Sequence, residues 1–192
     1  MTGEFDDILN GKVLKNKIEK FGITHYRYND CEPFNLTTVN NFKVHKDCAL
    51  AFKKMREAAK LDKIHLKVVS GYRSSRYQKQ VFKCKFNGIY PTSEQMKARL
   101  KYSAPSGFSE HHTGLAIDIN DTEDRFKDTK EYKWLKKHAY KYGFENSFPQ
   151  NNVQNLGFEP WHWRFIGENG EYKYIFEQAR QNDNRFDNEY KK

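Results

Sequence analysis

Apolar residues recur every three to four positions along several stretches of the chain, a spacing typical of amphipathic helices. This pattern predicts helices over residues 47–61, 74–86, 93–102, 130–142 and 170–181. Asp47 and either Ser74 or Ser75 are the expected N-caps of the first two helices, because short polar side chains accept hydrogen bonds from the free N–H groups there. Gly143 is the expected stop of the fourth helix.

Three shorter stretches are dominated by apolar and aromatic residues, and they predict strands at residues 64–69, 115–119 and 161–166. The middle stretch is apolar on both faces, as expected of a central strand. The order of these elements predicts an α+β fold in which a small sheet is flanked by helices.

The chain has 192 residues, which is enough for one domain with an ordinary core. Residues 1–45 contain turn-forming pairs at Asn10-Gly11 and Asn29-Asp30, and we expect them to form an irregular wrap with short elements. Residues 46–181 are expected to be the main domain, and residues 182–192 a polar tail that frays.

One acidic residue interrupts the predicted central strand. An unpaired carboxylate is costly to bury, so Asp118 needs a partner in this apolar setting. A divalent metal would supply one, and His111, seven residues earlier, is placed to share the ion. A second imidazole, His162, lies on the last predicted strand, three residues after Glu159. Two imidazoles, one carboxylate and an open position make a catalytic zinc shell, and Glu159 is the expected general base.

The remaining histidines are interpreted differently. A lone histidine is usually an ordinary surface or core imidazole, and four are assigned in that way: His25, His45, His65 and His138. His112 neighbours His111 but would point the opposite way in an extended chain, so we do not expect it to be a metal ligand.

A second motif, Ser70 to Gln78, joins a predicted strand to a helix through a glycine turn. Arg73 would lie near the start of this helix, where its planar guanidinium can clamp a carboxylate or stabilise an oxyanion. The alternative is a solvated arginine beside a helix N-cap. Trp161 and Trp163 flank His162, and we expect one face of the pair to join the core and the other to wall a substrate groove.

The net charge of +9 and the pI near 9.3 suggest an anionic partner, although Lys and Arg are scattered rather than clustered. An anionic wall polymer is one candidate. A nucleic-acid role is not expected, because no basic module with interleaved aromatics is visible. No apolar run approaches the ~20 residues of a membrane helix, and residues 1–10 lack the layout of a signal peptide. Three widely spaced cysteines are expected to be buried free thiols: Cys31, Cys48 and Cys84.

Three blocks, in this order, match a known family. They are Ser70-Gly71-Tyr72-Arg73-Ser74 with Gln78, Ser109-x-His111-x-x-Gly114-x-Ala116-x-Asp118, and Glu159-Pro160-Trp161-His162-Trp163-Arg164. Over residues 70–167 the chain resembles the zinc D-alanyl-D-alanine carboxypeptidases of the VanY type, in the wider group that includes lysostaphin-like peptidases and the hedgehog signalling domain.

The resemblance implies a hedgehog- or D,D-peptidase-like zinc peptidase fold with a small mixed or antiparallel sheet. It implies Zn²⁺ ligands at His111, Asp118 and His162, a catalytic base at Glu159, and stabilisation of the substrate or transition state by Arg73. It also implies substrate contacts, for which the matching positions are Ser109, Gln78, Tyr72 and Trp161.

The leading hypothesis is a zinc carboxypeptidase that removes a terminal D-amino acid, D-Ala, from peptidoglycan stem peptides at a D,D or an L,D bond. One alternative is an endolysin-type endopeptidase that cuts inside the stem. Another is a zinc-bearing binding module without catalysis, which the glutamate at position 159 argues against. The resemblance implies a location in the cell envelope, outside the cytoplasmic membrane.

Overall fold

The alternation of helical and strand-like patterns is reproduced in the computed structural model, which describes residues 3–11 and 15–189. Its α-helices are α1 (Asp6–Asn10), α2 (Lys15–Glu19), α3 (Lys46–Leu61), α4 (Ser75–Cys84), α5 (Ser93–Tyr102), α6 (Lys130–His138) and α7 (Lys173–Glu189). The strands are β1 (Leu36–Val39), β2 (Phe42–His45), β3 (Val68–Ser70), β4 (Ala116–Ile119), β5 (Phe144–Asn146) and β6 (His162–Phe165). Short 3-10 helices are η1 (Pro33–Asn35), η2 (Glu110–Thr113), η3 (Asp124–Asp128) and η4 (Ala139–Tyr142).

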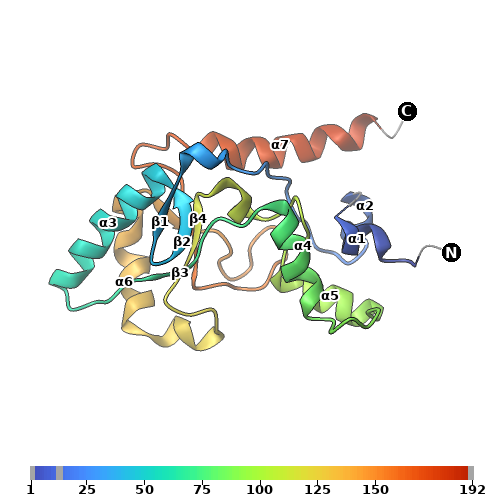
Figure 1. The fold of residues 1–192 in the computed structure, drawn as a ribbon, viewed down its shortest axis with the longest axis horizontal. Coiled ribbons are helices and arrows are strands. Elements are labelled where there is room, and N and C mark those ends of the chain that lie inside the picture. The colour runs from blue at the N-terminus through green and yellow to red at the C-terminus, as the bar shows by residue number, and fades with distance from the viewer. Residues whose placement is uncertain (1–2, 12–14, 190–192) are drawn as a thin grey trace.

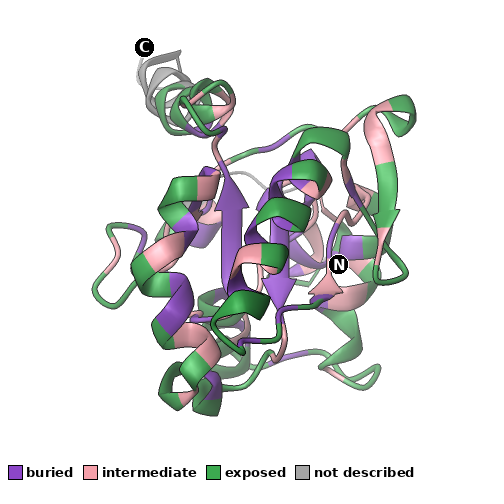
Figure 2. Ribbon diagram, turned by 90° about the vertical axis from the view of Figure 1, so that its left-hand side faces the viewer, coloured by how far each residue is buried: buried purple, intermediate pink, exposed green. Residues whose placement is uncertain are grey.

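An antiparallel sheet with strand order β3-β4-β6-β5 forms the centre of the fold, and β1 and β2 make a separate hairpin (Figure 1). Every residue of β4 and β6 is buried, which confirms that the apolar stretch ending at Ile119 is a central strand. Figure 2 shows these buried strands between helices whose outer faces are exposed. The α+β fold predicted from the sequence is therefore confirmed.

Of the two predicted helix N-caps, one is confirmed and the other is wrong. Ser74 caps α4 by accepting a hydrogen bond from the N–H of Tyr77 at 3.2 Å. The N-cap of α3 is His45 rather than Asp47: its Nδ1 accepts from the Asp47 N–H at 3.3 Å. Asp47 instead lies in the first turn, where a negative charge favours the helix dipole.

The helix predicted for residues 130–142 is an α-helix at first and a 3-10 helix in its last turn. α6 stops at His138, and η4 continues the turn in 3-10 form to Gly143, which has φ +75°. A side chain at Gly143 would also collide with the backbone of Gly167, so a glycine is required there for two reasons.

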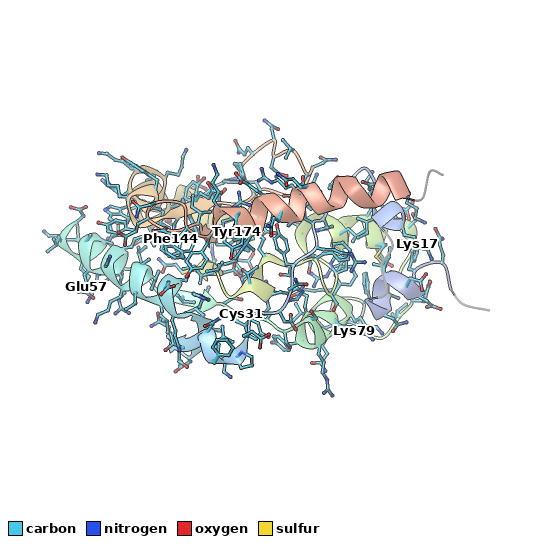
Figure 3. The ribbon with its side chains drawn as sticks, turned by 90° about the horizontal axis from the view of Figure 1, so that it is seen from above. Lys17, Cys31, Glu57, Lys79, Phe144 and Tyr174 are labelled. Carbon is cyan, nitrogen blue, oxygen red and sulfur yellow. The ribbon has the colours of Figure 1, made fainter. Side chains whose placement is uncertain are left out.

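The elements predicted at residues 64–69 and 170–181 differ more from the sequence prediction. Only the end of the apolar stretch 64–69 is a strand, because Ile64 still donates its N–H to a carbonyl of the preceding helix, that of Ala59. The last helix, α7, begins at Lys173 and runs to Glu189, beyond the predicted end at residue 181. Figure 3 shows it extending lengthwise along the molecule. The final three residues of the expected polar tail lie outside the described residues.

The apolar side chains form two clusters. The larger one joins the sheet to α3, α6 and the start of α7. The smaller one packs α1 and α2 against α4 and α5, and these helices lie together at one end of the molecule (Figure 1). Its members include Phe5, Ile8 and Ile18 from the N-terminal segment and Phe82 and Leu100 from α4 and α5. Residues on both sides of the predicted boundary after residue 45 therefore pack in one apolar cluster.

Candidate metal centre

Three polar side chains converge at the centre of the sheet. The register of β4 and β6 places Asp118 opposite His162, and η2 brings in His111. Their potential ligand atoms lie within 4.8 Å of one another, and all three residues are buried. Nε2 of His111 is 3.4 Å from Oδ2 of Asp118, and Nδ1 of His162 is 3.0 Å from Oδ1. The three residues singled out by the sequence thus form one cluster.

The ring orientation of His111 fits a metal ligand. Its Nδ1 lies 2.7 Å from the carbonyl oxygen of Gly71, so we assign the ring proton to Nδ1. The lone pair of Nε2 then faces the carboxylate of Asp118, and this buried atom has no hydrogen-bond partner. Two acceptors that face each other in a buried site call for a cation between them. The donor set of this cluster therefore fits a divalent metal.

The pKa values of the cluster support the same interpretation. Burial and the nearby guanidinium of Arg73 lower the pKa of His111 to about 4, so this imidazole is neutral at physiological pH. Burial also disfavours a charge on His162, but its hydrogen bonds to Asp118 and Glu110 raise its pKa to about 10. Burial acts against ionised Asp118 as well, yet the neighbouring imidazoles hold its pKa well below the usual range. In the metal-free protein, a proton on His162 therefore supplies the positive charge.

Glu159 lies beside the cluster, with Oε2 3.9 Å from Nδ1 of His162. Burial raises the pKa of this carboxyl to about 7, in spite of the opposing effect of His162. Its side chain is 14% exposed and lines a pocket, so it can reach solvent while remaining largely desolvated. A carboxyl with these properties is suited to exchange protons near neutral pH.

Arg73 reaches the same pocket from the turn after β3. A side chain at Gly71 would collide with the carbonyl oxygen of Lys43, so this turn needs a glycine. The Arg73 N–H donates to the His111 carbonyl at 3.1 Å. Burial lowers the pKa of the guanidinium, while the charges of Asp118 and Glu159 oppose this effect. Its Nε is buried without a partner, and the solvated alternative does not describe it.

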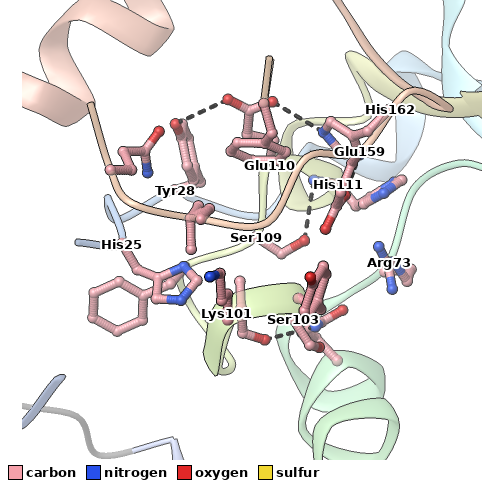
Figure 4. Close-up of a pocket in the computed structure, with 17 residues that line it drawn as sticks. His25, Tyr28, Arg73, Lys101, Ser103, Ser109, Glu110, His111, Glu159 and His162 are labelled. Atoms are coloured by element: carbon pink, nitrogen blue, oxygen red, sulfur yellow. Dashed lines mark hydrogen bonds and ion pairs between the residues drawn. The ribbon is translucent and has the colours of Figure 1, made fainter. Parts of the chain in front are cut away.

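Figure 4 shows this pocket with Arg73, His111, Glu159 and His162 around it. Ser109 and Gln78, the first two predicted substrate contacts, line it as well. Each also has a local role: Ser109 Oγ accepts from the His111 N–H at 3.3 Å, and the Gln78 amide donates to the Ala104 carbonyl at 2.7 Å.

The other two predicted substrate contacts do not line this pocket. Tyr72 directly follows the glycine turn, and burial together with the charges of Asp30 and Glu32 raises the pKa of its hydroxyl. Trp161 packs against the main apolar cluster.

His112 is directed away from the cluster, although it lies with His111 in the 3-10 helix η2 and not in an extended segment. Its Nδ1 lies 2.6 Å from the carbonyl oxygen of Arg73, and its Nε2 accepts from the Gly107 N–H at 3.0 Å. Both ring nitrogens are therefore occupied by backbone groups. His112 is not part of the cluster, and it instead connects the turn that carries Arg73 to the loop before η2.

Two charged residues of the pocket were not predicted from the sequence. Glu110 is buried and contacts His162, and Lys101 lines the wall contributed by the end of α5 (Figure 4). The available signal for Glu110 was its position between Ser109 and His111, inside a block in which every residue is buried. No local pattern marks Lys101, which is one of many lysines on polar helix faces.

The chain is similar in sequence to known proteins. The family model described as VanY, D-alanyl-D-alanine carboxypeptidase, matches residues 41–168. A putative carboxypeptidase, YodJ of Bacillus subtilis, is 38% identical over 133 residues, or 65% of this chain and 47% of that protein. A D-alanyl-D-alanine carboxypeptidase of Enterococcus faecalis is 34% identical over 117 residues, or 58% of this chain and 44% of that protein. The matched segments thus span less than half the length of these two relatives.

Solved structures with the same fold include two peptidases. A vancomycin resistance D,D-pentapeptidase, VanY, in complex with Zn(II), has a TM-score of 0.60 and 29% identity, covering 77% of this chain and 85% of that one. An LD-carboxypeptidase, LdcB, has a TM-score of 0.60 and 31% identity, covering 79% of this chain and 71% of that one.

Proposed function

Because this chain belongs to the VanY D-alanyl-D-alanine carboxypeptidase family, we propose that it is a zinc-dependent carboxypeptidase that removes the terminal D-alanine of peptidoglycan stem peptides. The observation that carries this proposal is the buried His111–Asp118–His162 cluster, with the unpartnered Nε2 of His111, beside a glutamate in the same pocket. A non-catalytic module would not need a buried carboxyl at this position.

His111, Asp118 and His162 would hold the ion, through Nε2, a carboxylate oxygen and Nδ1. When bound, zinc supplies Lewis acidity, which polarises a carbonyl oxygen and lowers the pKa of a water in the site toward ~7. The Zn(II) complex of the similar D,D-pentapeptidase supports this choice of metal.

Glu159 would act as the general base and then as the general acid. It takes a proton from the attacking water and afterwards gives it to the amine of the leaving amino acid. Burial disfavours the ionised form of this carboxyl, which supports its role as the group that takes up a proton and holds it for the leaving amine.

Arg73 and Lys101 are the Arg and Lys side chains among the residues that line the pocket. We assign Arg73 to the negative charge that develops on the carbonyl oxygen, because it faces the cluster and Glu159. Lys101, on a separate wall, is then free to pair with the terminal carboxylate of the substrate (Figure 4). A pocket cation with this role favours an exopeptidase over an endopeptidase, whose substrate has no carboxylate at that point.

A location at the cell envelope follows from this substrate, and the net charge of +9 would favour approach to anionic wall polymers. Within the described part of the chain, no helix has both the length and the apolar character needed to cross a membrane.

The test is release of free D-Ala from a pentapeptide and from a tetrapeptide stem, with and without a zinc chelator. Chelator-sensitive release from the pentapeptide identifies a D,D bond, and release from the tetrapeptide alone identifies an L,D bond. The similar structures include one enzyme of each kind. Solubilised wall without free D-Ala would instead indicate an endopeptidase. No hydrolysis by the zinc-loaded protein in any of these assays would refute the proposal.

A further inference from the structure

The carboxylate of Glu110 is buried next to the metal centre and is surrounded by donors. On Oε1 it accepts from Nη1 of Arg164 at 2.9 Å and from the Tyr28 hydroxyl at 3.4 Å. On Oε2 it accepts from Nε2 of His162 at 3.1 Å and from the Ser147 hydroxyl. Both oxygens are therefore saturated by donors that come from separate segments of the chain.

The outer partners of Arg164 keep this arrangement fixed. Nε of Arg164 donates to Glu145 at 2.6 Å, on the side of the guanidinium that faces away from Glu110. The same guanidinium lies over the ring of Phe176 in α7, 4.8 Å from its centroid. A planar fork held on two sides has little freedom to rotate, so Oε1 of Glu110 stays engaged and Oε2 remains directed at His162.

An ionised carboxylate can only accept hydrogen bonds. The imidazole of His162 must therefore carry a proton on Nε2 whenever it keeps this contact. In the neutral ring, the lone pair then belongs to Nδ1, the nitrogen that faces Asp118 at 3.0 Å. The opposite tautomer would place two lone pairs against each other at the Glu110 contact and a proton where the metal would bind.

We propose that Glu110 is a positioning residue that fixes the Nε2–H tautomer and the orientation of His162, so that Nδ1 is presented to the metal. This inference rests on the proposed zinc site and adds a residue that does not touch the ion. Carboxylate partners of this kind fix the orientation of ligating histidines, and their loss reduces metal affinity about 10- to 100-fold.

Glu110→Gln tests the proposal because it preserves the size of the side chain and removes its acceptor-only character. The amide oxygen pairs with Arg164, which cannot accept, so the amide N–H group turns toward His162. Nε2 then becomes the acceptor, and the ring proton moves to Nδ1. We expect the zinc affinity of this variant to fall about 10- to 100-fold in competition with a chromophoric chelator.

Nitrogen NMR of histidine-labelled, zinc-loaded protein supplies a second readout that does not depend on activity. In the unsubstituted protein, we expect the His162 resonances of a protonated Nε2 and a metal-bound Nδ1. At the same free zinc concentration, a smaller fraction of Glu110→Gln should show this pattern, because zinc on Nδ1 requires the proton on Nε2. This measurement on the unsubstituted protein remains decisive even if the variant fails to fold, since a metal-bound Nε2 would overturn the proposal.

Glu145→Gln is the matched control. It makes the same chemical change on the other side of Arg164, and Glu145 contacts Arg164 rather than the imidazole. We expect it to keep the Nε2–H tautomer and to change zinc affinity by less than about fivefold, as for a partly exposed ion pair. Equal zinc affinity in all three proteins would refute the role of Glu110. Failure of the unsubstituted protein to bind zinc would instead refute the proposed function itself.

Discussion

Asp118 on β4 and His162 on β6 are paired across the antiparallel sheet, and 3.0 Å separates Oδ1 of the first from Nδ1 of the second. These residues lie 44 positions apart in the chain, so the strand register brings them together. A shift of the register by one residue would turn one of the two side chains to the other face of the sheet. The metal centre therefore depends on the same pairing that buries the core.

Glu159→Gln should keep zinc and lose most turnover. The amide retains the size of the carboxyl but cannot take a proton, and general-base catalysis contributes about 10²- to 10⁴-fold. Zinc content and kcat for D-Ala release from the preferred stem check this expectation. Retention of kcat in the zinc-loaded variant would show that another group is the base.

His162→Ala should lose zinc and the stability that zinc confers. Metal binding to the native state stabilises it by about 2.7 kcal/mol at a concentration 100 times Kd, so Tm of the unsubstituted protein should rise with added zinc. The variant should show no such rise. If its Tm still responds to stoichiometric zinc, His162 is not a ligand.

His112→Ala should separate folding from metal binding. This imidazole is fully buried and bridges Arg73 and Gly107, so its loss leaves buried backbone groups unpaired. We expect a loss of about 1–3 kcal/mol in the free energy of unfolding, measured by urea denaturation, with zinc stoichiometry unchanged. His111→Ala is the matched comparison, and equal loss of zinc in both variants would contradict the assignment of ligands.

The free energy of unfolding of the zinc-free protein should contain a contribution from Glu159 that decreases as pH rises. Burial raises the pKa of this carboxyl from 4.5 to about 7, so the native state holds the proton more tightly than the unfolded state. The contribution of Glu159 to the free energy of unfolding is therefore fully present below pH 4.5 and is lost as the pH rises from 4.5 to 7. Each unit of difference between the folded and unfolded pKa values corresponds to about 1.4 kcal/mol.

Subtracting the same measurement on Glu159→Gln isolates this effect. Titrating groups that do not interact with Glu159 contribute equally to both proteins, and urea unfolding at pH 4.5 and pH 8 gives the difference for Glu159 and the groups coupled to it. A difference that does not change with pH would show that the Glu159 carboxyl has an ordinary pKa in the folded protein.

Lys101→Gln should raise KM for a stem peptide with a free terminal carboxylate and leave kcat nearly unchanged. An ion pair that forms equally in the ground state and the transition state affects substrate binding and not the chemical step. We expect KM to rise about 10-fold, which corresponds to roughly 1.4 kcal/mol of binding free energy. The control is Lys97→Gln, on the same helix but outside the pocket. Equal KM values for all three proteins would remove Lys101 from carboxylate recognition.

The order of the helices and strands, and the residues that form the metal cluster, could be predicted from the sequence. The metal cluster was indicated by an aspartate within an apolar strand, together with two histidines and a glutamate. The glycine turn before Arg73 indicated that this arginine lies near the start of a helix, where it can contact a substrate. These features are local, because a strand of apolar residues cannot hold an unpaired carboxylate wherever it packs.

The tertiary structure decided what lies around that cluster. Glu110 and Lys101 reach the pocket from segments that meet only after folding. The N-terminal helices likewise pack their apolar side chains against α4 and α5. Tyr72 and Trp161 are not among the residues that line the pocket, since the direction of a side chain depends on the register and turns of its segment. The sequence by itself thus determined which residues could bind a metal and move a proton. Packing between distant segments decided which neighbours orient them, because hydrogen bonds and burial are set by three-dimensional contact.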